Sequence, residues 1–144
     1  MAFTGNFMCT SFKVEILKAV HNFTLSTGNT FNIAMYDNSA SFTAATTAYT
    51  ASNEVTGTAY VAKGNTLVNV TPTSTSTTAF TDFGDSTWSS STITARGAMI
   101  FNDTASGDPS VVILDFGSDK SSSSGDFTIV FPTGDATSAI IRIA

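Results

Sequence analysis

The chain has 144 residues, and charged residues make up only 12% of it, about half of the usual ~25%. A hydrophobic fraction of 42% with 12 Phe, beside 44 Ser and Thr, excludes the low-hydrophobicity, high-charge class of disordered chains and indicates a hydroxyl-rich folded protein. With a net charge of −5 and six scattered basic residues, the chain has no cluster to bind nucleic acid, and no apolar run reaches the ~20 residues that span a membrane.

The N-terminal part predicts an apolar arm over residues 1–10, followed by one short helix over residues 11–22. Thr10 or Ser11 can cap the start of this helix, and Gly28 follows its end. Apolar residues recur at helical spacing: Phe12, Ile16, Leu17, Val20 and Phe23. This stripe is expected to close one end of a β core, with docking on a neighbouring subunit as the alternative.

The middle of the chain predicts strands joined by tight turns. Residues 30–36 alternate in polarity, which predicts a strand. Residues 54–62 and 66–70 predict a hairpin around Lys63-Gly64-Asn65, where Gly and Asn accept positive φ. The low-complexity run 71–78 is either a flexible link or an exposed edge strand, and its Pro72 makes the strand harder.

The second half continues with short β-branched runs bounded by Gly, Pro, Asp or Ser. The predicted strands are 79–88, 93–102, 110–116, 126–132 and 138–144, with a loop tip at 117–125. Gly97 within a strand suggests a bulge or a close backbone approach. The last strand is expected to be held in a sheet, in a neighbouring subunit, or in both.

About eight short strands in this order predict a single domain over residues 1–144. The fold class is mainly all-β: an antiparallel β-sandwich over residues 30–144, jelly-roll-like, with one short N-terminal helix. The N-terminus has no basic segment followed by an apolar one, so no signal peptide is expected.

The residues that carry chemistry are few. Cys9 is the one cysteine, which excludes an internal disulfide and a thiolate zinc site. His21 is the one histidine, placed at the helix end where it is expected to bond free carbonyls. Two DFG tripeptides, at 82–84 and 115–117, lack the other kinase motifs. We therefore expect no enzyme, no catalytic residues, no cofactor and no metal site.

Paired acidic residues and aromatic residues give two weaker alternatives. Turn carboxylates can bind calcium, but turn Asp residues usually bond their own backbone; the pairs are Asp82/Asp85, Asp103/Asp108 and Asp115/Asp119. Aromatic residues could form a sugar-stacking face, but packing in the core or an interface is favoured; they are Trp88, Tyr36, Tyr49 and Tyr60.

Several segments, taken together, cover nearly the whole chain and resemble a family of small structural proteins of tailed bacteriophages and prophages. They are SFKVEILKAVHNF, NTFNIAMYDNSA, TTAYTASNEVTGTAY, TARGAMIFND, VVILDFGSDKSSSSGDFTIVFP and SAIIRIA. The most specific pieces are HNF (21–23), EVTGT, TARGA (94–98) and the final AIIRIA. The resemblance implies a virion component rather than an enzyme, and no catalytic residues come with it.

Among virion components, the function expected is capsid decoration: a cement protein on the outside of the virion head, made in the bacterial cytoplasm. Its partners would be the phage major capsid protein and copies of itself, with a trimer as one arrangement, and without nucleic acid or membrane. The expected interface residues are Phe3, Phe7, Phe12, Ile141 and Ile143. Removal of residues 1–10 is then expected to abolish attachment without unfolding the sandwich.

Two alternatives to capsid decoration stay open. One is a tail, collar or baseplate component, which would differ in copy number per virion. The other is a carbohydrate-binding adhesin module, which would lose glycan binding when Trp88 or an exposed Tyr is replaced.

Overall fold

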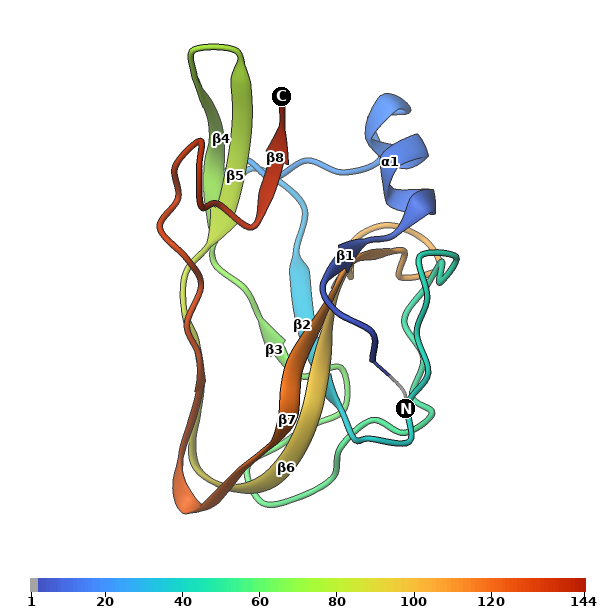
Figure 1. Cartoon of the computed structure of the whole chain (residues 1–144), viewed down its shortest axis with the longest axis vertical. Coiled ribbons are helices and arrows are strands. Elements are labelled where there is room, and N and C mark those ends of the chain that lie inside the picture. The colour runs from blue at the N-terminus through green and yellow to red at the C-terminus, as the bar shows by residue number, and fades with distance from the viewer. Residues whose placement is uncertain (1–2) are drawn as a thin grey trace.

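The computed structural model describes residues 3–144 and is mainly β, with two antiparallel sheets and one short helix (Figure 1). The five-stranded sheet has the order β1-β7-β6-β2-β3, and the three-stranded sheet has the order β4-β5-β8. The elements are β1 (Phe7–Met8), α1 (Thr10–Leu17), β2 (Phe31–Tyr36), β3 (Asn65–Thr66), β4 (Asn69–Thr75), β5 (Thr78–Phe83), β6 (Ser86–Asn102), β7 (Ser110–Ile129) and β8 (Ile141–Ile143). The predicted all-β antiparallel sandwich with one short helix is confirmed.

A long hairpin of β6 and β7 organises the molecule. The two strands pair from Ser86↔Ile129 to Phe101↔Ser110, with several register shifts between them. Figure 1 shows the hairpin curving at its lower end, so that one half lies in the five-stranded sheet and the other half rises toward β5. The hairpin thereby connects the two sheets.

The loop tip predicted over 117–125 is wrong, because this segment belongs to β7. Serine-rich runs are poor strand signals. Here, however, hydroxyl groups bond across the two strands, at 2.8 Å between Thr94 and Ser121 and at 2.7 Å between Ser91 and Ser122. These cross-strand bonds replace the apolar contacts that sequence patterns detect.

The hairpin predicted from 54–62 and 66–70 is also wrong. Residues 54–62 make isolated bridges, Tyr36↔Glu54 and Thr58↔Thr92, and β3 pairs with β2 instead. The turn before β3 has the expected positive φ, 73° at Lys63 and 66° at Gly64. Because that turn sends the chain back along β2, the two predicted strands cannot face each other.

The β4-β5-β8 sheet tests two further predictions. Residues 71–78 form most of the β4–β5 hairpin, so the edge-strand alternative is right, and Pro72 lies in the register shift between Val70 and Thr73. The C-terminal strand is held in a sheet as expected, because β8 pairs with β5.

The helix ends at Leu17 rather than at residue 22. Ala19 has a φ of 57°, which an α-helix cannot continue through, and the N–H of Ala19 bonds back to Ile16. Phe12 is the buried residue of α1, whereas Leu17 is 88% exposed. The apolar residues predicted to form one stripe therefore do not form a single buried face of a helix.

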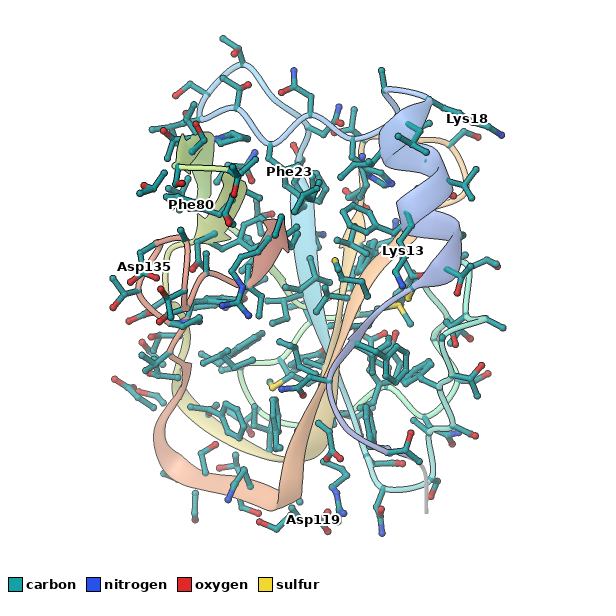
Figure 2. The ribbon with its side chains drawn as sticks, turned by 45° about the horizontal axis from the view of Figure 1, so that its top comes forward. Lys13, Lys18, Phe23, Phe80, Asp119 and Asp135 are labelled. Atoms are coloured by element: carbon teal, nitrogen blue, oxygen red, sulfur yellow. The ribbon has the colours of Figure 1, made fainter. Side chains whose placement is uncertain are left out.

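The core is built around β2, all six residues of which are buried. Phe23 stacks on Phe31 with ring centroids 4.4 Å apart, and Phe83 packs against both. Figure 2 shows Phe23 beside β2. Among the described residues, no helix is long and apolar enough to cross a membrane.

Candidate docking surface

Three of the five predicted interface residues lie in the chain's own core. Phe3 is 1% exposed, Phe12 1% and Ile141 3%. Phe7 is half-buried, and Ile143 is 53% exposed. The expectation that these five side chains form one surface is corrected: Ile143 is the member that a neighbouring protein can contact directly.

The predicted N-terminal arm is part of the fold from Phe3 onward, and residues 1–2 lie outside the described residues. Phe7 pairs with Ile113 of β7. The carboxylate of Asp115 accepts a hydrogen bond from the N–H of Gly5 at 3.1 Å, and the N–H of Asp115 donates to Asn6 Oδ1 at 2.7 Å. The segment therefore completes the five-stranded sheet instead of projecting from it.

His21 links α1 to β6 and does not bond free helix carbonyls. Its Nε2 lies 2.9 Å from Glu15 Oε2, and its Nδ1 lies 3.0 Å from Asn102 Nδ2. Because Asn102 Oδ1 accepts from the N–H groups of Thr104 and Ala105, the amide nitrogen must face His21. Nδ1 is then an acceptor and Nε2–H donates to Glu15, so both ring nitrogens serve the fold.

Glu54, in the EVTGT segment, is the centre of a second polar cluster. Its carboxylate accepts from the hydroxyl groups of Tyr49 at 2.6 Å and Tyr60 at 2.7 Å, and from the N–H of Lys63 at 2.7 Å. Burial, followed by the bond to Glu54, raises the pKa of Tyr49 to about 12, and the same two causes raise the pKa of Tyr60 further. These bonds fasten the loop after β2.

The three acidic pairs are engaged within the chain. Lys63 Nζ lies 2.8 Å from both Asp103 and Asp108, while Asp115 and Asp119 each lie 3.7 Å from Arg96. Buried Asp82 accepts from the N–H groups of Phe83 and Ile140, and Asp85 accepts from that of Phe131. Within residues 3–144, no three His, Cys, Asp or Glu side chains come together as metal ligands would.

Two of the four aromatic residues considered for a sugar-stacking face are buried. Trp88 is 3% exposed and Tyr36 is fully buried. Tyr60 lies over Trp88 with ring centroids 6.0 Å apart, and Tyr49 packs on Phe101. Because Trp88 and Tyr36 are buried, they cannot stack on a sugar ring at the surface.

The β4-β5-β8 sheet, in contrast, extends beyond the core that it covers. Its paired residues Thr81 and Ile141 are buried, but the next pair on the same face, Ala79 and Ile143, is exposed. No strand in the described part of the chain pairs with the outer edge of β8. Figure 1 shows this sheet projecting at the end of the molecule where α1 also terminates.

Ile143 of β8 is 53% exposed beside this open edge, whereas Leu25 and Val70, which are 49% and 41% exposed, lie beside or on β4 at the other edge of the sheet. Leu25 is held beside β4 by a bond from its N–H to Thr71 Oγ1 at 3.0 Å. An open sheet edge with apolar side chains is a template for pairing with another protein.

The sequence pattern hides this surface. In TLVNV the polar Asn69 is 8% exposed and the flanking Val68 and Val70 point outward, which inverts the usual polarity. Asn69 is inside because its amide donates to the carbonyl of Asn29 at 2.9 Å. A partner for Asn69 forty residues away in the sequence leaves no local signal.

Comparisons of the chain with protein-family models, with curated proteins and with solved structures found no match. The candidate surface is therefore defined by its geometry and by the residues that form it.

Proposed function

We propose that this protein is a structural subunit of a bacteriophage virion, a decoration protein that binds the outside of the head and bridges capsid subunits. The observation that supports the proposal most is the open edge of β8 with Ile143 exposed beside it. The resemblance of the chain to small phage structural proteins supplies the virion context.

The proposed mechanism joins backbone pairing with apolar burial. A strand of a capsid subunit adds to the outer edge of β8, and its side chains cover Ile143. Each exposed aliphatic side chain contributes roughly 1.5–3 kcal/mol when it is fully buried. Because a head presents many equivalent sites, a modest interface per copy can still hold an oligomer firmly.

The low charge of the chain fits contacts that depend on shape. The contact at the edge of β8 depends on backbone pairing and on Ile143, so little of its binding free energy comes from ion pairs, and attachment through it should change little with salt concentration. A protein that attached through charge would instead dissociate as the salt concentration rises.

The test is co-sedimentation of purified protein with heads of the encoding phage from which the gene has been deleted. We expect Ile143→Asp to weaken binding by about tenfold or more, because a carboxylate would be buried in the interface. The matched control is Val61→Asp, since Val61 is 73% exposed but lies in the loop before β3. Equal binding by the wild type and by Ile143→Asp would contradict the proposal.

A further inference from the structure

A groove of about 810 Å³ lies between β7 and the C-terminal segment that leads into β8. On one side β7 contributes Leu114–Phe116 and Asp126–Ile129, and on the other the C-terminal segment contributes Ser138–Ile140 and Arg142.

The edge of β7, and not one of its two faces, borders this groove. A strand that presents a face contributes alternate residues, because successive side chains point to opposite sides. Here the consecutive residues 126–132 all line the groove, and of the described residues that line it none belongs to β6. It is therefore the edge of β7 facing away from β6 that borders the groove.

This edge has free backbone groups. In the described chain β1 pairs with β7 at Val112 and Ile113, and beyond them β7 pairs with β6 alone. The outer edge of β8 is likewise unpaired. A groove bordered by two open strand edges has the form that a further strand would fill.

The groove is lined by both apolar and polar residues, and two cations on its rim form no ion pair in the described part of the chain. Phe127, Ile129 and Phe131 lie 7–9% exposed along it. Lys120 and Arg142 are exposed on the rim, and neither forms an ion pair within the part of the chain that the structure describes.

The acidic residues of the groove do not offset these cations fully. Asp115 is already bound by Arg96 and by the N–H groups of Gly5 and Gly117. Asp126 accepts a hydrogen bond from the N–H of Ser90 and remains on the rim. Lys120 and Arg142 therefore face the carboxylate of Asp126, and Arg142 also interacts electrostatically with Asp135 outside the groove lining.

We infer that this groove binds an extended segment of a neighbouring protein, in which apolar residues alternate with acidic ones. Its backbone pairs with the free edge of β7, its apolar side chains cover Val130, which is 71% exposed, and its carboxylates meet Lys120 and Arg142. The identity of the neighbour as a capsid protein rests on the proposed function, whereas the mode of binding rests on the groove alone. Strand β4 of a second copy is not the segment that we infer, because Asn69–Thr75 contains no carboxylate to meet Lys120 and Arg142.

The experiment uses a synthetic peptide of alternating Val and Glu with solubilising ends, and a matched peptide with Lys in place of Glu. Binding to the full chain is followed by fluorescence anisotropy, and amide chemical shifts in NMR spectra locate the site. We expect the acidic peptide to bind about tenfold more tightly than the basic one, with shifts at residues 126–131. N-methylation of alternate peptide bonds should abolish binding, because it removes the donors that pair with β7.

Charge variants separate groove binding from general attraction. The double variant Lys120→Glu/Arg142→Glu should reverse the preference between the two peptides. The double variant Lys13→Glu/Lys18→Glu changes the net charge equally on and after α1, where Figure 2 shows both side chains, and should leave the preference unchanged. Equal effects of the two variants, unchanged binding after N-methylation, or self-association that the peptide disrupts would each overturn the inference.

The proposed function and the groove assignment are tested by separate experiments: detection of the chain in virions tests the first, and peptide binding tests the second. A chain absent from virions that still binds the acidic peptide would refute the proposed function and leave the groove assignment intact. A head protein that ignores the peptide would refute the groove assignment alone.

Discussion

Phe3 lies so close to Gly97 that a Cβ on residue 97 would stand 2.4 Å from Phe3 Cε1. The same Cβ would stand 2.5 Å from the carbonyl oxygen of Leu114, within the register shift of β6 and β7. The ring of Phe3 also packs edge-on against Phe42, with centroids 5.6 Å apart. The start of the chain is thus seated on the central hairpin.

Gly97→Ala should destabilise the fold, because neither the ring of Phe3 nor the backbone of Leu114 can move away cheaply. We expect a loss of about 1–3 kcal/mol in the free energy of unfolding, measured by urea denaturation. Gly84→Ala is the matched control, since its Cβ would meet Val68 at an ordinary 3.5 Å. Equal stability of the two variants would show that Phe3 does not occupy this position.

Phe3→Ala should cost about 3–5 kcal/mol, because it empties a position that is 1% exposed. Removal of residues 1–10 should destabilise the domain still more, since it also removes β1. This reverses the expectation that the segment is a dispensable arm. Thermal unfolding followed by circular dichroism tests it, and a truncated chain with an unchanged Tm would contradict the structure.

Glu54→Gln should lower the pKa of Tyr49 from about 12 toward its ordinary value of 10.0. Burial still raises the pKa in the variant, but the bond to a charged acceptor is lost. In the wild type, stability associated with Tyr49 is present below pH 10 and is lost as the pH rises through about 12. Tyrosinate absorbance during alkaline titration measures this, and ionisation of the first tyrosine at the same pH in both proteins would contradict the contact.

Asp82 and Asp135 should give stability contributions of opposite sign as the pH changes. Burial raises the pKa of Asp82, so its contribution is present below pH 3.8 and is lost as the pH rises through the folded-state pKa. Hydrogen bonds from the N–H groups of Thr137 and Ser138 lower the pKa of Asp135, so its contribution is present above pH 3.8 and is lost as the pH falls.

Urea denaturation of Asp82→Asn and Asp135→Asn across the acidic range measures the two contributions. The advantage of the wild type over Asp82→Asn should shrink as the pH rises above 3.8, and its advantage over Asp135→Asn should shrink as the pH falls below 3.8. If the free energy of unfolding of each variant differs from that of the wild type by the same amount at every pH, the environments described for Asp82 and Asp135 are wrong.

Local patterns predicted much of the fold. The alternation over 30–36 gave β2 within one residue, the run 93–102 gave the buried half of β6, and Gly97 was expected at a bulge or close approach. These elements are apolar and bounded by turn residues, so their signals are contained within a few neighbouring positions.

Elements held by distant polar contacts could not be predicted in this way. The serine-rich middle of β7 is a strand because hydroxyl groups of β6 face it, and Asn69 is inside because Asn29 receives its amide. The candidate surface was found in part: Ile143 was expected, but Phe3 and Phe12 turned inward, and only the three-dimensional pairing of β8 with β5 shows where the open edge lies.

The central claim, that the chain is a structural subunit on the virion head, is tested most directly by immunogold electron microscopy of purified virions with an antibody to the chain. The account predicts dense, regular label over the head. Label confined to the tail or to a single vertex would contradict decoration of the head, and virions without label would contradict a structural role altogether.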